Sequence, residues 1–198
     1  DAQKQFVNFL KLYPAGELRE EGEFWLSESY FLSGDFRNSM QHYAKFLNTY
    51  KNSKKYPEAL YGLAWSYFKA NEFSNAAQTF EEFTEKYPNS EFTYDSYLRL
   101  AECYYNTKNH EKSAGIYRLL IRQHRENKNT DFAYYQLAQT EYRSGNFEKA
   151  IDEFRNLIKY FPNSDLADDA QYGIGWMYFQ KKDYQKAITE FQLIQDRK

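Results

Sequence analysis

The sequence predicts an all-α fold built from antiparallel helical hairpins that repeat every 37 residues. Bulky residues recur at 37-residue intervals along the whole chain. Within each unit, apolar residues recur at spacings of three and four, which is the face of an amphipathic helix and not the alternation of a strand. Eight glycines and four prolines in 198 residues are also too few for the many reversals of an all-β protein.

Three columns of equivalent residues define the repeat. One is aromatic and consists of Phe6, Tyr43, Phe80, Tyr117, Phe154 and Phe191. A second is bulky and consists of Phe9, Phe46, Phe83, Leu120, Leu157 and Ile194. A third is always small, as helices that cross closely require, and consists of Ala2, Ser39, Ala76, Ser113, Ala150 and Ala187.

These columns divide the chain into a half repeat and five repeats of one solenoid. The half repeat spans 1–14, and the repeats span 15–51, 52–88, 89–125, 126–162 and 163–198. The first unit is a lone second helix, and no polar capping helix follows the last unit. We therefore expect a fragment of a longer chain whose uncapped ends are open to self-association.

A tight turn joins the two helices of each unit. Gly34, Asn71 and Gly145 suit a left-handed residue that ends the first helix. Lys108 and Lys182 suit that position less well, so we expect those two turns to differ in detail. The second helices have suitable N-cap residues in Asp35, Asn109, Asn146 and Asp183.

The order of small, bulky and turn positions resembles the tetratricopeptide repeat. Leu137-Ala138, Gly145, Ala150, Phe154, Leu157 and Pro162 fit its pattern, as do Ile174-Gly175, Tyr178, Ala187 and Phe191. Glu141 departs from it, because the family has tyrosine there. The resemblance implies a right-handed superhelix that serves as a non-catalytic scaffold for protein-protein interaction.

Each unit is three residues longer than the usual 34-residue repeat, and the extra residues precede the first helix. With Ser90 or Ser164 as N-cap, we expect the first helix to be lengthened at its N-terminus. Phrases such as FEEFTEKYPNSEF resemble repeats of the bacterial outer-membrane assembly lipoprotein and the periplasmic Tol-Pal coordinator. That likeness implies a bacterial envelope complex in the periplasm or at the outer membrane; the alternative is a cytoplasmic protein.

The resemblance also implies that the first helices line a concave groove for a peptide or helix. Spacing assigns to it a stripe of mostly aromatic residues, namely Phe24, Glu28, Phe31, Tyr61, Trp65, Phe68, Leu98, Glu102, Tyr105, Tyr135, Gln139, Tyr142, Tyr172, Trp176 and Phe179. Trp65, Trp176, Tyr135 and Tyr172 are the foremost contact candidates. Aromatic residues at helical spacing are also typical of a core, so packing is the competing interpretation.

Composition and motifs argue against catalysis and against other partners. The net charge of −2 gives no electrostatic motive for binding nucleic acid, and no apolar run is long enough to insert into a membrane. His42, His110 and His124 form no ligand pair, so we expect no metal and no cofactor. Cys103 has no activating neighbour and is expected to be structural. No phosphate loop or nucleophile motif occurs, so the chain is not expected to be an enzyme.

Two alternatives to the peptide-binding scaffold stay open. The first is a structural module that docks within a larger protein or an oligomer through its ends. The remote one is an RNA-binding helical repeat, which would need a basic groove. The one local excess of basic residues is more typical of a solvated helix end, and consists of Arg118, Arg122, His124, Arg125 and Lys128.

Overall fold

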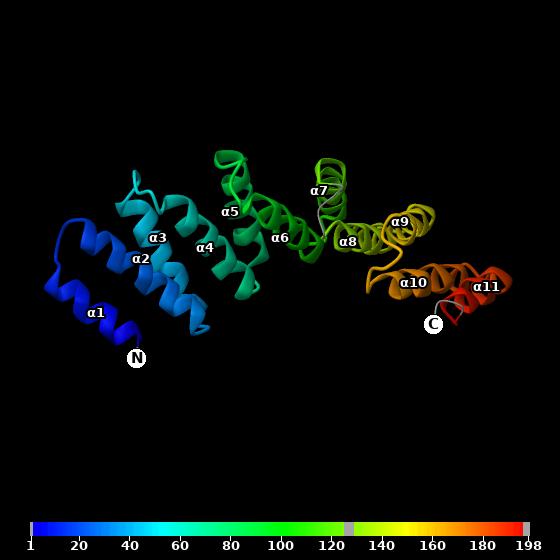
Figure 1. The fold of residues 1–198 in the computed structure, drawn as a ribbon, viewed down its shortest axis with the longest axis horizontal. Helices are drawn as coiled ribbons and strands as arrows, with labels where there is room; N and C mark the ends of the chain where they lie inside the picture. Colours follow the sequence, from blue (N-terminus) through cyan, green and yellow to red (C-terminus); the bar gives the residue numbers. More distant parts are fainter. Residues whose placement is uncertain (1, 125–128, 196–198) are drawn as a thin grey trace. The chain divides into compact units, whose positions relative to one another are not determined.

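The computed structural model describes residues 2–124 and 129–195, so Arg125 and Lys128 of the basic cluster lie outside the described residues. Within these ranges the chain forms eleven α-helices and no strand (Figure 1). The helices are α1 (Ala2–Leu12), α2 (Glu17–Leu32), α3 (Phe36–Thr49), α4 (Tyr56–Lys69), α5 (Phe73–Lys86), α6 (Thr93–Asn106), α7 (His110–Gln123), α8 (Thr130–Arg143), α9 (Phe147–Tyr160), α10 (Ala167–Gln180) and α11 (Tyr184–Gln195).

The helices gather into two compact units. The first unit spans residues 1–107 with α1 to α6, and the second spans 108–198 with α7 to α11. In the first unit α2 pairs with α3 and α4 with α5; in the second, α8 pairs with α9 and α10 with α11. The second helix of each pair also packs against the next helix within its unit, as α5 does against α6. The predicted all-α fold of stacked helical hairpins is thus confirmed.

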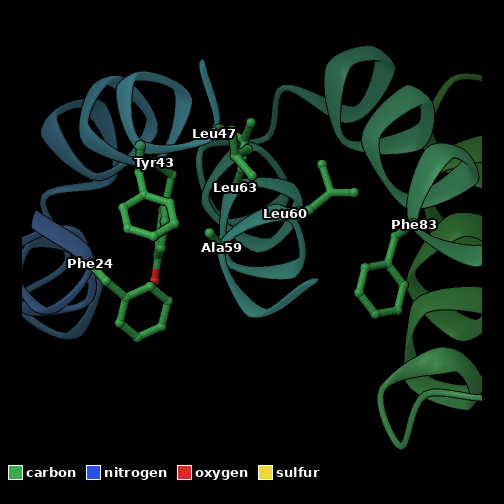
Figure 2. Close-up of a cluster of buried hydrophobic side chains, with 8 residues drawn as sticks. Phe24, Tyr43, Leu47, Ala59, Leu60, Leu63 and Phe83 are labelled. Carbon is green, nitrogen blue, oxygen red and sulfur yellow. The ribbon is translucent and has the colours of Figure 1, made fainter. Parts of the chain in front are cut away.

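The aromatic column of the second helices supplies much of the core. Tyr43, Phe80, Tyr117 and Phe154 are at most 1% exposed. In the first unit Tyr43 belongs to a buried cluster with residues from α2, α4 and α5, and Figure 2 shows Phe24 beside it. Burying one such side chain stabilises the fold by roughly 1.5–3 kcal/mol. Each hairpin therefore depends on its neighbours for its core.

The small column lies where paired helices cross. Ala64 and Ala76 are fully buried, and so are Ala138 and Ala150. At the α2–α3 crossing the Ser39 hydroxyl donates to the Ser27 carbonyl at 3.4 Å. Small side chains let the helix axes approach closely, as the sequence predicts.

The turns inside the hairpins share one backbone conformation. Gly34, Asn71 and Gly145 have φ of 79°, 59° and 80°, as predicted. The expectation that the turns at Lys108 and Lys182 differ is wrong, because both lysines have φ of 62°. A left-handed lysine costs roughly 1–2 kcal/mol. The helix end offsets this cost, because the amide of the left-handed residue and the amide after it donate to the last carbonyls, as at Lys182 (2.9 Å to the Phe179 carbonyl).

Three of the four predicted N-caps form. Asp35, Asn109 and Asp183 each accept a hydrogen bond from the amide three residues later, at 3.2, 3.4 and 3.3 Å. Asn146 does not cap α9; its Nδ2 instead donates to Oε2 of Glu141 at 2.7 Å. The carboxylate of Glu141 is buried, and buried polar groups are hydrogen-bonded, so the Asn146 side chain bonds Glu141 and does not cap α9.

The predicted lengthening of the first helices is wrong. Helix α6 begins at Thr93 and α10 at Ala167, so the three extra residues before these two helices lie in the loop; α2, with 16 residues against 14, is longer. The Ser90 hydroxyl accepts from the amide of Phe92 at 3.3 Å, and Ser164 bonds Leu166 in the same way at 3.1 Å. A serine that bonds the backbone two residues later favours a turn over a helix start.

Candidate functional site

The first unit carries an aromatic cluster on α4, and we call Tyr61, Trp65 and Phe68 the first aromatic face. The Tyr61 and Trp65 rings meet edge to face at 6.3 Å, and Trp65 and Phe68 do so at 5.4 Å. Residues of α2, α3 and α4 enclose a hollow of about 350 Å³ beside this face. The hollow is lined by Glu28, Phe31, Tyr43, Tyr61, Gly62, Trp65 and Lys69.

The hollow is lined by one carboxylate, that of Glu28, and by one ammonium group, that of Lys69. The buried Tyr43 hydroxyl donates to Oε1 of Glu28. Burial raises the pKa of Tyr43, and the negative charge of Glu28 raises it further. The ammonium of Lys69 lies 5.2 Å from the centre of the Trp65 ring. The hollow can therefore accept an apolar side chain between a carboxylate and an ammonium group.

Helix α6 covers much of the first aromatic face. Phe92, at the start of α6, stacks on Tyr61 with ring centres 4.6 Å apart. The Tyr61 hydroxyl donates to Oδ2 of Asp95 at 2.8 Å. The guanidinium of Arg99 lies 5.2 Å from the centre of the Trp65 ring, an ordinary cation–π distance. The predicted groove residues on α4 are thus half-buried by packing within the unit.

Glu102 and Tyr105 lie on α6 and are also half-buried. Oε2 of Glu102 accepts from Nη1 of Arg99 at 2.6 Å, so the acid is already paired. Burial raises the pKa of Glu102, and Arg99 works in the opposite direction. Phe24 and Leu98 are only 5% and 3% exposed. These two belong to the core and not to an open groove, which corrects the prediction for both.

The second unit carries the equivalent cluster on α10, and we call Tyr172, Trp176 and Phe179 the second aromatic face. Each is 111 residues after its counterpart on α4, or three repeats. The Trp176 and Phe179 rings stack at 5.6 Å, and the Phe179 ring meets that of Tyr184 at 5.5 Å. Tyr172, Trp176 and Phe179 are 55%, 39% and 47% exposed. This face is open.

The remaining predicted residues lie on α8 and are half-buried. The Tyr135 ring packs at 5.4 Å on Phe154, and Tyr142 packs at 5.6 Å on Phe147. Gln139 donates from Nε2 to the Tyr135 hydroxyl at 3.3 Å. In the second unit, α10 is therefore more open than α8.

Sequence reasoning missed two cations that lie on the first aromatic face, Lys69 and Arg99. A signal for Arg99 is its spacing, because Asp95 and Glu102 stand four residues before it and three after it on one helix. Oδ1 of Asp95 accepts from Nε of Arg99 at 3.4 Å. The arginine is held over the rings by both acids.

The remaining candidates for chemistry are Cys103 and the side chains that could bind a metal ion. Cys103 is fully buried, and burial raises the pKa of its thiol to about 12. In residues 2–124 and 129–195, no three His, Cys, Asp or Glu side chains gather in a way that would hold a metal ion. Over the same ranges, no helix has the length and apolar character needed to cross a bilayer.

Comparisons with known proteins agree with the fold. Family models described as tetratricopeptide repeat match residues 21–53, 58–90 and 95–127, and residues 135–198. No curated protein matches the sequence significantly. Among solved structures, a crystal structure of MamA is similar at a TM-score of 0.70 and 20% identity, over 87% of this chain and 94% of that one.

Two further structures are similar in fold. MamA from Desulfovibrio magneticus RS-1, from residue 41 to its end, has a TM-score of 0.70 at 16% identity, over 100% of this chain and 95% of that one. BtubC from P. vanneervenii has a TM-score of 0.69 at 15% identity, over 99% and 86%. At these identities the likeness extends to the fold alone.

Proposed function

Because the chain belongs to the tetratricopeptide repeat family, we propose that it is a non-catalytic scaffold that binds a peptide or helix of another protein on the aromatic faces of its first helices. Repeat proteins of this family generally bind protein partners. The observation that carries the proposal is the open second aromatic face, where three rings on one helix are 39–55% exposed.

An open row of rings is a favourable surface for a partner. Tryptophan and tyrosine are over-represented among residues that dominate binding energy, because they bury a large rigid area with little loss of side-chain freedom. Trp176 lies between Tyr172 and Phe179 in the sequence of α10, and its ring stacks on that of Phe179 at 5.6 Å. On the first unit, the hollow beside Trp65 adds a place for one apolar side chain.

Affinity capture with the Trp65→Ala, Trp176→Ala double variant tests the proposal. We expect the intact chain to retain a partner that the double variant loses, while circular dichroism shows equal helix content in both. Trp25→Ala is the matched control, because Trp25 is 45% exposed on α2 but belongs to neither face. Equal capture by the intact chain and the double variant would refute binding at the aromatic faces.

We also propose that the partner belongs to a bacterial envelope complex in the periplasm or at the outer membrane. The support is the resemblance of FEEFTEKYPNSEF and similar phrases to repeats of envelope proteins. Fractionation of the source cell tests this prediction. Recovery of the protein in the cytoplasmic fraction would contradict it.

A further inference from the structure

The two aromatic faces carry the same residue pattern, but only one of them is covered. Tyr61, Trp65 and Phe68 on α4 correspond to Tyr172, Trp176 and Phe179 on α10, and Phe73 on α5 corresponds to Tyr184 on α11. On α4 the residues are half-buried, whereas on α10 and α11 their counterparts are all exposed. The first unit therefore contains a template for what can cover the second face.

The helix that covers the first face is α6, and it packs against both α4 and α5 (Figure 1). Two of its residues, and Phe92 directly before it, make the specific contacts. Phe92 stacks on Tyr61 at 4.6 Å, Asp95 accepts from the Tyr61 hydroxyl at 2.8 Å, and Arg99 lies 5.2 Å from the Trp65 ring centre. Arg99 is also 5.8 Å from the Phe68 ring centre, so it lies over two of the three rings.

The apolar residues next to the two aromatic faces, on α5 and α11, also differ in exposure. Ala77 and Phe80 on α5 are 5% and 0% exposed. Their counterparts on α11 are Ile188 and Phe191, of which Ile188 is 52% exposed and Phe191 half-buried. The uncovered surface on α10 and α11 thus has the same two parts as the surface that α6 covers, a row of rings and an aliphatic edge.

We propose that the second aromatic face, with Ile188 at its edge, binds an amphipathic helix of a partner protein that carries an aromatic residue, an aspartate three residues later and an arginine four residues after that. This deepens the proposed function and rests on it. The partner aromatic stacks on Tyr172, its aspartate accepts from the Tyr172 hydroxyl, and its arginine lies over Trp176 and Phe179.

The signature is specific within this chain. The residues equivalent to Phe92, Asp95 and Arg99 in the other first helices are Leu18, Glu21 and Trp25; Lys55, Glu58 and Gly62; Asn129, Phe132 and Gln136; and Leu166, Asp169 and Gly173. None of these sets combines the three residue types. Among the described first helices, only α6 has the full pattern, so a general tendency of these helices to stack does not account for it.

A synthetic peptide of residues 90–107 provides the probe, with acetylated and amidated ends and Cys103→Ser. Fluorescence anisotropy of the labelled peptide measures binding to the full chain. We expect saturable binding that weakens about ten-fold or more with Trp176→Ala in the chain or Arg99→Ala in the peptide. Trp25→Ala in the chain is the control and should leave the affinity unchanged, because Trp25 belongs to neither face. Loss of binding with Trp65→Ala alone would place the peptide on the first face and overturn the proposal.

A second measurement keeps the proposal testable when the free peptide binds too weakly to titrate. The same 18 residues are appended after Lys198 through a flexible linker, which raises their local concentration to about the millimolar range. In a Trp25→Phe, Trp65→Phe background, acrylamide quenching of Trp176 should fall relative to a scrambled appendage. Unchanged quenching would overturn the proposal.

Two other results separate the possible occupants from one another and from the proposed function. Dimerisation of the chain alone that disappears with Trp176→Ala would identify a second copy as the occupant and overturn the partner helix. Failure of both peptide tests, with partner capture still dependent on Trp176, would refute the α6-like signature and leave the proposed function standing.

Discussion

Replacing Gly62 by alanine tests the packing of the first unit at its tightest point. A Cβ added at Gly62 would lie 2.6 Å from the Tyr43 hydroxyl oxygen and closer still to Cζ of the same ring. The Tyr43 ring cannot move aside, because it is fully buried and its hydroxyl donates to Glu28. The variant must therefore shift the α3–α4 packing.

The expected cost follows from two opposing effects. Overpacking a filled core costs about 1–3 kcal/mol, and alanine in a helix interior returns about 1 kcal/mol relative to glycine. We expect a net loss of up to about 2 kcal/mol in the free energy of unfolding. Gly115 on α7 is the matched control, because an added Cβ there meets nothing within 4 Å. Gly115→Ala should stabilise by about 0.5–1 kcal/mol.

Urea unfolding followed by circular dichroism measures both variants. With an m-value of about 2 kcal/mol/M, the Gly62→Ala midpoint should fall by up to about 1 M and the Gly115→Ala midpoint should rise. A Tyr43→Leu background makes room for the methyl group, so Gly62→Ala should cost less in it. If Gly62→Ala stabilises as much as Gly115→Ala, the close contact with Tyr43 does not exist and the reasoning fails.

Three further predictions concern buried polar groups. Arg118→Ala leaves the carboxylate of Glu141, which is 2% exposed, without its ion-pair partner. We expect urea unfolding to show a loss of about 1–3 kcal/mol in the free energy of unfolding, which Glu141→Gln partly recovers. Additive effects of the two substitutions would contradict the pairing. Burial, assisted by the nearby ammonium of Lys45, lowers the pKa of His42 below 6.5, so the folded state binds fewer protons than the unfolded state and stability falls as the pH drops through about 6.5. His42→Gln should lose less stability than the parent between about pH 7.5 and 5.5, and equal pH profiles would refute this. Cys103 should react with Ellman's reagent at about pH 8 only after unfolding, and rapid reaction of the native protein would contradict its burial.

The repeat explains why so much of the fold was predictable. A hairpin unit buries its aromatic column only against its neighbours, so residues such as Phe80 and Phe154 must recur at a fixed interval, and that interval is visible in the sequence. The left-handed turn residues at Gly34 and Gly145 were predictable for a local reason, because the backbone conformation favours glycine there. Lys182 adopts the same conformation because the helix end imposes it.

The candidate site was predictable in position but not in exposure. The spacing that placed Trp65 and Trp176 on equivalent surfaces says nothing of what covers each surface. Trp65 lies under Arg99, whereas Trp176 is open. The stripe therefore contains both core residues and exposed residues, and binding of a partner by the exposed ones stays a prediction. Phe24 is core and Tyr172 is open, although their spacing is the same.

Glu141, which replaces the tyrosine of the family pattern, also has a partner that the repeat pattern alone does not identify. The first-helix position that holds Glu141 is tyrosine in the preceding repeat and in the following one, where Tyr104 donates to Glu81 and Tyr178 accepts from Arg155 at 3.2 Å. At Glu141 the partner is Arg118, so the acid and its complementary cation occur together.

The sequence by itself determined the helical hairpins, their 37-residue period and the residues of the core columns, because these depend on periodicities along one chain. Only the tertiary structure decided which aromatic rings are covered, which loops absorb the extra residues and which cations lie over the rings. Those outcomes depend on side chains that meet across helices from different repeats, and a linear pattern does not contain the distances between them.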